Sequence, residues 1–213
     1  VISYRETGTS FDLRILKCST PDCSAGAAIS ADGPSDVGEY TSVAIGADGI
    51  PVVSYYDLDP ANTSLKLARC TDASCTAATT TAVDSAGAAT DMGTYTSLAI
   101  GVDGLPVIAY RDETNTALRV AHCGSAGCTS GNALNVVDGP NAGQHASLAI
   151  GIDGFPVIAY RDSANDDLRV AKCSDEACAT PATVTPVDGA LESVGKFTSL
   201  TIGTEGFPVI AYA

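Results

Sequence analysis

Short runs of tyrosine, arginine and aspartate are the residues of this sequence best suited to hold a ligand. They recur along the chain behind apolar segments, and arginine and tyrosine are frequent anchors of binding surfaces. The candidate ligand-binding residues are Tyr110, Arg111, Asp112, Tyr160, Arg161, Asp162, Tyr56 and Asp57. We expect from them a set of similar, shallow sites for a polar ligand such as a glycan. The simpler interpretation is a series of surface ion pairs, which are worth little. The absence of Trp and the 6% aromatic content speak against a sugar site.

The cysteines form a second regular set, with one C-x4-C pair at the same place in each of four repeats. An even and regular count indicates disulfides formed in an oxidising compartment, whereas a zinc site would need four ligands around one point. We therefore expect four local, equivalent disulfides and an extracellular or periplasmic location, secreted or at the cell surface. The pairs are Cys18/Cys23, Cys70/Cys75, Cys123/Cys128 and Cys173/Cys178.

Acidic residues in glycine-rich turns and two histidines complete the candidates for chemistry. Asp48, Asp103, Asp153 and Glu205 follow a glycine by two positions, and side-chain capping of the turn explains them more simply than calcium binding. His122 stands before a cysteine where other repeats have Lys or Arg, so we expect a solvated strand residue. His145 stands where other repeats have Tyr or Phe, which indicates a packing role. We expect no metal, no cofactor and no catalytic residue.

The elements that must position these residues come from an internal repeat. The segment Ser147–Asp162, SLAIGIDGFPVIAYRD, has near-copies at Ser42–Asp57 and Ser97–Asp112, a shortened copy at Ser199–Ala213 and a half-copy at Val1–Glu6. One repeat predicts four strands, at 147–150, 157–160, 168–173 and 182–187, joined by turns and by the cysteine hairpin. No stretch has helical periodicity, so no substantial helix is expected.

Repeats of about 52 residues, each a four-stranded antiparallel meander, predict an all-β fold of the β-propeller type. Both faces of each strand are apolar, as required where a sheet packs between two others. We expect a single β-propeller domain over residues 1–213. Its repeats would be residues 40–94, 95–144 and 145–196, with a fourth made of residues 1–39 plus 197–213.

The repeat resembles that of NHL-type propellers. The run Leu98-Ala99-Ile100-Gly101-x-Asp103-Gly104-x-Pro106-Val107-Ile108-Ala109-Tyr110-x-Asp112-x-x-Asn115 is similar to the NHL pattern of two inner strands and the following loop. This chain has a longer period, a proline after the turn and a cysteine hairpin. The resemblance implies a blade and names no activity, because NHL relatives include protein-binding, RNA-binding and enzymatic members.

Composition limits the partners. The net charge of −14 repels nucleic acid and anionic membranes, and no apolar run is long enough for a membrane helix. We expect a non-catalytic interaction or structural module, with a protein or another copy of itself as partner. The alternatives are a glycan-binding lectin that uses the loop face and, third, a propeller-type hydrolase or lyase.

The chain ends carry one strand too many. Val1–Tyr4 and Val209–Tyr212 are both copies of the second strand of the repeat. We expect a closed four-bladed ring in which Ser199–Ile202 joins the N-terminal strands. The alternatives are a segment of a larger ring and an assembly that exchanges terminal strands.

Overall fold

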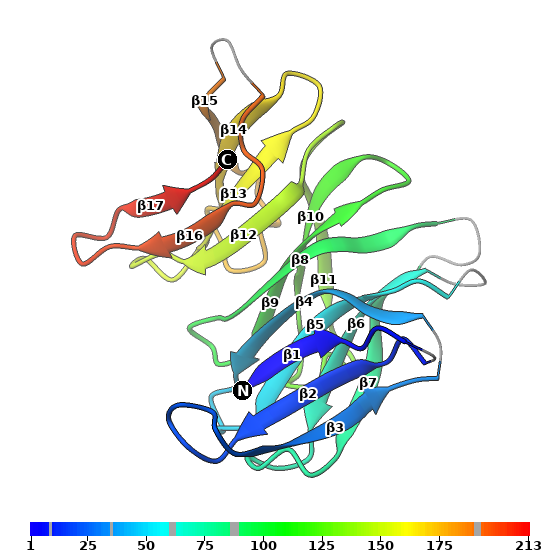
Figure 1. Ribbon diagram of the computed structural model, residues 1–213. Coiled ribbons are helices and arrows are strands. Elements are labelled where there is room, and N and C mark those ends of the chain that lie inside the picture. Colours follow the sequence, from blue (N-terminus) through cyan, green and yellow to red (C-terminus); the bar gives the residue numbers. More distant parts are fainter. Residues whose placement is uncertain (9, 35, 60–62, 86–89, 190–192) are drawn as a thin grey trace.

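The strands expected from the repeat are present in the computed structural model, which describes residues 1–8, 10–34, 36–59, 63–85, 90–189 and 193–213. The described chain is all β, and no segment of it forms a helix that could cross a membrane. Three sheets have four strands each, one has three and one has two. In every sheet the strands are antiparallel and neighbours in sequence, so each sheet is a meander (Figure 1).

The strand bounds follow the repeat. The N-terminal sheet contains β1 (Ile2–Arg5), β2 (Leu13–Cys18) and β3 (Gly26–Asp32). The three full sheets contain β4 (Val37–Ile45), β5 (Pro51–Asp57), β6 (Ser64–Cys70) and β7 (Ala78–Asp84); β8 (Met92–Ile100), β9 (Pro106–Asp112), β10 (Ala117–His122) and β11 (Ala133–Asp138); and β12 (Gln144–Ile150), β13 (Pro156–Asp162), β14 (Asp167–Lys172) and β15 (Thr183–Asp188). The C-terminal sheet contains β16 (Ser199–Ile202) and β17 (Pro208–Ala211).

The first strands of successive sheets lie side by side along one edge of the molecule. β4 contacts β8, β8 contacts β12 and β12 contacts β16. We call the edge that these four strands form the inner edge, and it is visible in Figure 1. A serine hydroxyl on each first strand accepts a backbone N–H from the next one: Ser42 from Leu98 at 3.0 Å and Ser97 from Leu148 at 2.9 Å. These bonds fix the spacing between neighbouring sheets.

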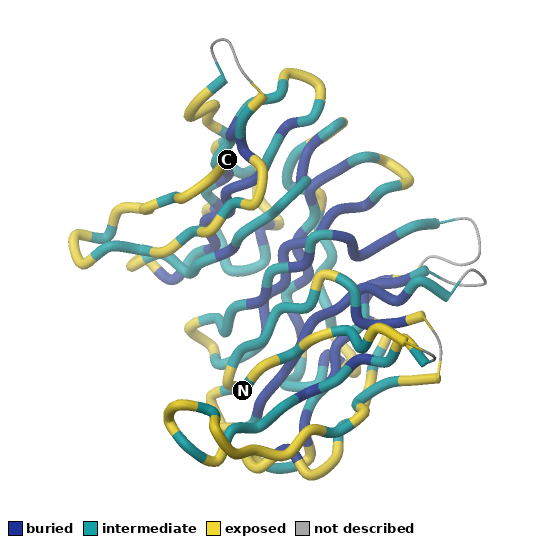
Figure 2. Tube along the Cα trace, viewed as in Figure 1, coloured by how far each residue is buried: buried dark blue, intermediate teal, exposed yellow. Residues whose placement is uncertain are grey.

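The core lies between sheets, as the apolar character of both strand faces predicted. On β9, Ile108 and Tyr110 belong to the hydrophobic cluster shared with the preceding sheet, and Val107 and Ala109 to the cluster shared with the next. Alternate residues of a strand point to opposite faces, which explains this division. Burying one such large apolar side chain contributes about 1.5–3 kcal/mol. Figure 2 shows the buried residues concentrated in the middle sheets and the exposed ones in the two terminal sheets.

All four predicted disulfides are present, and each closes the hairpin between the third and fourth strands of its repeat. The Cys70–Cys75, Cys123–Cys128 and Cys173–Cys178 bridges are buried, and each belongs to a cluster that contains strand residues of the preceding sheet. These three bridges therefore add to the packing between sheets as well as closing hairpins. Four disulfides favour an oxidising extracellular environment.

The Cys18–Cys23 bridge differs from the other three in burial. It forms as predicted, but Cys18 and Cys23 are only half-buried, and neither belongs to the hydrophobic clusters of the described residues. The physical reason is its place in the array. The other bridges pack against a preceding sheet, and the N-terminal sheet is the first of this chain. The bond between Cys18 and Cys23 thus closes its hairpin without joining two sheets.

The predicted ring closure is not formed within this chain. β16 pairs with β17, and their sheet is separate from β1–β2–β3. Figure 1 shows the two sheets at opposite ends of the array. The fourth repeat, expected from residues 1–39 plus 197–213, is therefore two unconnected sheets. The physical reason is local: β17 reaches β16 through a short turn, and a short loop closes at a lower entropic cost than one spanning the whole chain.

Candidate functional site

The predicted ligand-binding residues are mostly inside the protein. Tyr110 and Tyr160 have no exposed surface, and Asp112 and Asp162 are 1% and 2% exposed. Arg111, Tyr56 and Asp57 are also buried, whereas Arg161 keeps part of its surface in contact with solvent. The set does not form an open row of sites. These residues are the last ones of the second strands β5, β9 and β13. Both faces of these strands are covered by neighbouring sheets.

The buried tyrosines connect neighbouring sheets. At four equivalent positions, three on second strands and one directly after β17, a tyrosine hydroxyl donates a hydrogen bond to the last aspartate of the preceding sheet. We call these the Tyr–Asp bridges: Tyr55–Asp32 (2.6 Å), Tyr110–Asp84 (2.5 Å), Tyr160–Asp138 (2.5 Å) and Tyr212–Asp188 (2.6 Å). Burial, together with the charge of the bridging aspartate, raises the pKa of Tyr110 and of Tyr160, so both remain hydrogen-bond donors.

The predicted aspartates support the same network. Arg169 lies 3.4 Å from Asp138 of the preceding sheet and 2.5 Å from Asp162 of its own. Burial would raise the pKa of Asp162, but hydrogen bonds from Asn165 and the Ala164 N–H and the charge of Arg169 lower it. The Asp162 carboxylate therefore has a structural role. It bonds the loop after its own strand and the side chain of Arg169, which also contacts the preceding sheet.

The predicted arginines also bond other residues of the chain. Arg111 donates to Glu113 at 2.8 Å and to the backbone carbonyl of Ala142 at 2.7 Å. Arg161 donates to Gln144 at 2.8 Å and to Ser193 at 3.0 Å. Both therefore tie a second strand to the link before a first strand. Parts of two such links, residues 86–89 and 190–192, lie outside the described residues.

An exposed aromatic row, which the sequence did not reveal as a site, lies along the inner edge. Its members are the aromatic residues at the same position of four successive repeats, Tyr40, Tyr95, His145 and Phe197, which we call the aromatic row. Neighbouring rings have their centroids 4.7, 4.7 and 4.8 Å apart and are tilted by 45–58°. Phe197 is 74% exposed and Tyr40 41% exposed. The prediction that His145 substitutes for an aromatic ring is confirmed.

An irregular backbone presents this row. The pairing of β4 with β5, of β8 with β9 and of β12 with β13 shifts register around the aromatic residue, as in a β-bulge. All four row residues have positive φ, between 51° and 54°. Positive φ is uncommon for bulky residues, and bulges redirect side chains next to functional sites. The same unfavourable conformation in four repeats indicates that the outward direction of the rings is itself a feature of the fold.

The row is neutral and has charged neighbours of both signs. Burial raises the pKa of Tyr40 to about 12, with smaller contributions from Tyr95 and Glu39. Burial lowers the pKa of His145, and the nearby charges of Arg161 and Lys196 lower it further. At neutral pH the row therefore presents four uncharged rings with acidic groups near one end and basic groups near the other.

A shallow groove runs along the row. It has a volume of about 160 Å³ and is lined by the four rings and by the residue that follows each of them, Thr41, Thr96, Ala146 and Thr198. The Thr96 hydroxyl donates to the carbonyl of Tyr40 at 2.8 Å, which links neighbouring repeats beneath the groove. The groove thus combines apolar ring faces with hydroxyl and charged groups at its margin, as small-molecule sites do.

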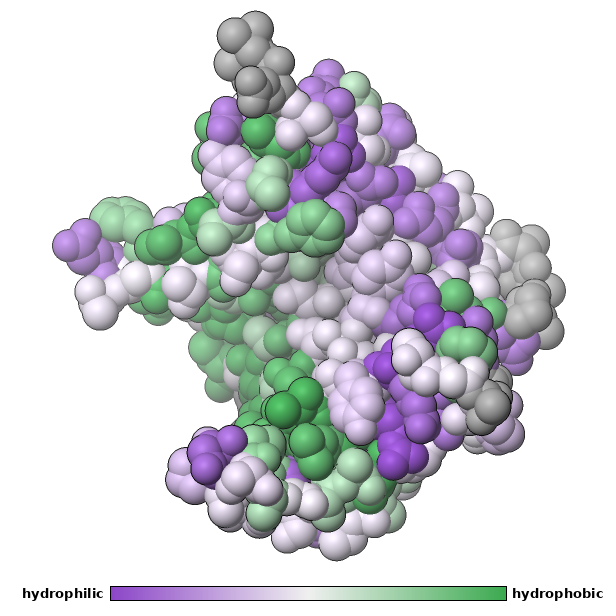
Figure 3. Space-filling model, in the orientation of Figure 1, coloured by the Kyte–Doolittle hydropathy of each residue, from purple (hydrophilic) through white to green (hydrophobic). Residues whose placement is uncertain are grey.

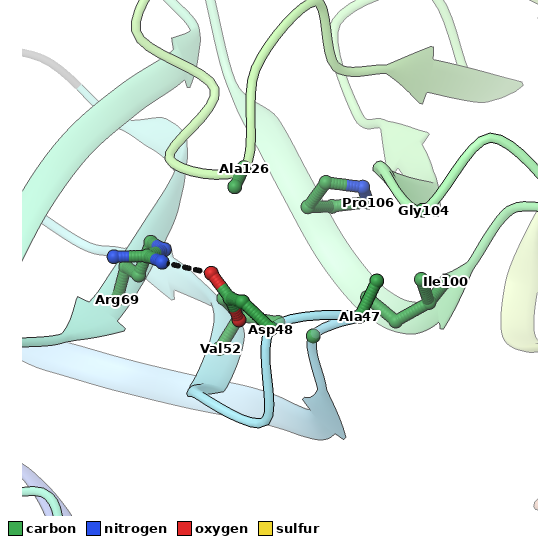
Figure 4. Close-up of a pocket in the computed structure, with 9 residues that line it drawn as sticks. Ala47, Asp48, Val52, Arg69, Ile100, Gly104, Pro106 and Ala126 are labelled. Carbon is green, nitrogen blue, oxygen red and sulfur yellow. Dashed lines mark hydrogen bonds and ion pairs between the residues drawn. The ribbon is translucent and has the colours of Figure 1, made fainter. Parts of the chain in front are cut away.

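The acidic turns fulfil their predicted capping role in three of four cases; the Glu205 side chain caps no described residue. Asp48, Asp103 and Asp153 each accept the backbone N–H two residues later, at 3.0–3.2 Å. Their free oxygens face a side chain of the third strand. In the first full sheet that partner is Arg69, and Figure 4 shows the ion pair it makes with Asp48 in a cavity of about 110 Å³.

The prediction for His122 was wrong. Its side chain is only 15% exposed, and its Nε2 lies 3.1 Å from an Asp103 carboxylate oxygen. Glu176 of the next sheet completes a group in which the ligand atoms all lie within 4.8 Å of one another. A sequence alignment of the repeats could have marked both His122 and Glu176 as departures, but not their proximity, which depends on how two sheets pack.

Comparison with known proteins addresses the fold. No protein-family model matches this sequence, and no curated protein is significantly similar to it. The resemblance to NHL repeats therefore has no support from these comparisons. Two solved structures are similar in fold at 12% sequence identity.

The first of them is a protein of unknown function from Dyadobacter fermentans, with a TM-score of 0.62 over 96% of this chain and 65% of that one. The second is an endo-arabinase from Bacteroides thetaiotaomicron, with a TM-score of 0.51 over 92% of this chain and 71% of that one. The chain thus spans just under two thirds of the first structure. At this identity the chain is similar to both proteins in fold alone.

Proposed function

We propose that this chain is a non-catalytic binding module built from β-propeller blades and that its aromatic row binds a glycan. The single observation that carries the proposal is the repeated positive φ, which directs four neighbouring rings outward along one groove. Buried packing does not require rings that are 41% and 74% exposed, as Tyr40 and Phe197 are.

The chemistry of the groove suits a sugar. Aromatic rings offer large, rigid apolar faces, against which the C–H face of a pyranose can pack. The groove also has the hydroxyls of Thr41, Thr96 and Thr198, which donate to the backbone and can accept hydrogen bonds from sugar hydroxyls. Rings repeated at 4.7–4.8 Å favour an extended oligosaccharide over a single compact ligand. The likeness in fold to an endo-arabinase is compatible with this class of ligand.

The propeller assignment has its own support. Four-stranded meanders pack face to face, and their first strands converge along one edge, where β4, β8, β12 and β16 are neighbours. This is the order of strands in a propeller blade. The disulfides suit a protein of the cell surface or the extracellular medium.

A glycan array followed by calorimetry tests the proposal. The chain should bind one class of oligosaccharide, and Tyr95→Ala should weaken that binding about tenfold or more, which corresponds to the loss of one aromatic contact of about 1.5 kcal/mol. Tyr4→Ala is the matched control, since Tyr4 is exposed and lies outside the row. Absence of binding to every glycan class, or equal loss in both variants, would reject the proposal.

A second function, self-assembly through the end sheets, is favoured by a specific contrast. Tyr55, Tyr110 and Tyr160 are buried in Tyr–Asp bridges, whereas the equivalent Tyr4 is 38% exposed and its hydroxyl makes no hydrogen bond to a described residue. Figure 3 shows a hollow between the two end sheets in which hydrophobic side chains gather. The large exposed apolar residues of the turns and the C-terminal sheet include Val102, Ile152, Phe207 and Val209.

We propose that a second copy of the chain binds the exposed surfaces of the N-terminal and C-terminal sheets. In a head-to-tail contact, the N-terminal sheet of one copy would continue the array of the other, as each internal sheet does. Light scattering should then give a dimer or larger species, and removal of residues 207–213 should return it to a monomer. A full-length chain that is monomeric at all concentrations would exclude this second function.

A further inference from the structure

We propose that Asp103, His122 and Glu176 form a binding site for a divalent transition metal of the zinc class, between two neighbouring sheets. Asp103 lies in the turn between β8 and β9 and His122 at the end of β10, while Glu176 comes from the cysteine hairpin between β14 and β15. One Nε2 atom and two carboxylate oxygens lie within 4.8 Å of one another. The site is separate from the aromatic row and independent of the proposed function.

The other repeats show why this cluster is unusual. Where Asp103 faces His122, Asp48 faces Arg69 and Asp153 faces Lys172. A permanent cation thus balances the turn aspartate in two repeats, and an imidazole takes its place in the third.

The residue that approaches from the next sheet changes as well. In the cavity drawn in Figure 4 the hairpin of the next sheet contributes Ala126, and Glu176 is its counterpart one repeat later. The cation is therefore lost and a second carboxylate is gained in the same place. Two carboxylates without a permanent positive charge make a site that a metal cation would balance.

The separation of Asp103 and His122 suits the proposed ion, and Glu176, whose carboxylate lies within 4.8 Å of both, would move closer to complete the three ligands. Zinc binds imidazole nitrogen and carboxylate oxygen at about 2.0–2.2 Å, so two ligands of a tetrahedral ion are roughly 3.4 Å apart. The observed separation between Asp103 Oδ2 and His122 Nε2 is 3.1 Å. Three protein ligands leave one coordination position for water. Mixed nitrogen and oxygen ligands favour zinc, cobalt or nickel over calcium and magnesium, which prefer oxygen alone.

Two further observations support a ligand role. His122 Nε2 is buried and lies 3.1 Å from Asp103 Oδ2, but this contact does not have the geometry of a hydrogen bond. A metal ion bound by both atoms would satisfy the buried nitrogen better than this contact does. The other oxygen of Asp103 accepts the N–H of Leu105 at 3.0 Å, which holds the carboxylate with Oδ2 directed at the histidine, as outer-shell contacts do at metal sites.

Calorimetry with zinc chloride tests the site. The disulfide-intact chain is treated with EDTA, dialysed and titrated at about pH 7.5, where imidazole is neutral. We expect one equivalent of Zn²⁺ to bind and to raise the melting temperature. Co²⁺ should give the absorption bands of a four-coordinate ion.

His122→Lys introduces the cation of the other repeats and should weaken binding about 100-fold or more, while Glu176→Ala introduces the residue found at 126 and should weaken it about tenfold or more. His145→Phe is the control and should bind like the unaltered chain. If His122→Lys does not fold, Glu176→Ala decides alone. The absence of saturable binding, full binding by Glu176→Ala, or its loss in His145→Phe would overturn the proposal.

Discussion

Two sets of aromatic side chains recur in every full repeat and have opposite roles. The tyrosines of the Tyr–Asp bridges, such as Tyr110, lie inside the protein with no exposed surface, and their hydroxyls bond the preceding sheet. The residues of the aromatic row, such as Tyr95, lie at the inner edge and line an open groove. Tyr95 lies on β8 and Tyr110 on β9, and these two strands pair with each other. The comparison shows that residue type alone does not decide function: a regular strand position buries its ring between two sheets, and a bulge with positive φ turns the ring outward.

The largest effect should come from removing a ring of the buried set. Tyr110 packs in the cluster that contains Val52, Leu67 and Ile108. Tyr110→Ala should therefore lower the free energy of unfolding by about 3–5 kcal/mol, from lost burial and the cavity left behind. Urea unfolding measures the change. A loss below about 1 kcal/mol would show that the bridge tyrosines do not hold the sheets together.

Removing only the hydroxyl should cost less. Tyr160→Phe keeps the ring but leaves Asp138 with Arg169 as its remaining charged partner. We expect a loss of about 1 kcal/mol in the free energy of unfolding, because the half-buried Asp138 loses one hydrogen bond and keeps those to Arg169 and the Gly139 N–H. Tyr212→Phe is the control, because it removes the same bond to Asp188 at an exposed position and should have a smaller effect. Equal losses in the two variants would mean that burial does not strengthen the bridge.

Removing a ring of the aromatic row should change the free energy of unfolding even less than removing the Tyr160 hydroxyl. Tyr95→Ala removes contacts with the rings of Tyr40 and His145 but opens no cavity between sheets. We expect a change within about 1 kcal/mol in urea unfolding. A loss as large as that of Tyr110→Ala would place the row in the core and argue against its role in binding.

The smallest effect should be a pH dependence from His145. Its pKa is lowered in the folded protein by burial and by Arg161 and Lys196. As the pH falls through about 6.5, the unfolded chain takes up a proton that the folded chain does not, so stability should fall until the folded pKa is also passed. His145→Phe should remove this part of the acid dependence, measured as melting temperature between about pH 7.5 and 5. Identical pH profiles for the unaltered chain and for His145→Phe would contradict a lowered pKa of His145 in the folded protein.

Much of this architecture could be predicted from the sequence, because its signals are local. The strands follow from alternating apolar residues and glycine turns, and the disulfides from cysteines five positions apart, so the partner is already nearby on the chain. Capping by Asp48 and Asp103 likewise depends on an N–H two residues away. Such features need no knowledge of how sheets pack.

Other features were decided only by tertiary structure, because they join residues 22 to 56 positions apart. The partner of Tyr110 is Asp84 of another sheet, so a residue that looked like a surface anchor is buried instead. The bridge at Cys23 matches the others in spacing but differs from them in burial, since no earlier sheet of the chain packs against it. The grouping of His122 with Glu176 also depends on two sheets meeting.

Ring closure was predicted and is absent, since a local hairpin competes for the same strand. The aromatic row, in turn, exists because successive first strands lie side by side. Sequence periodicity determines each repeat, because turns, strands and cysteine hairpins need only nearby residues. The packing between repeats determines which side chains face solvent, because each sheet is covered by neighbours that lie about 50 residues away in the chain.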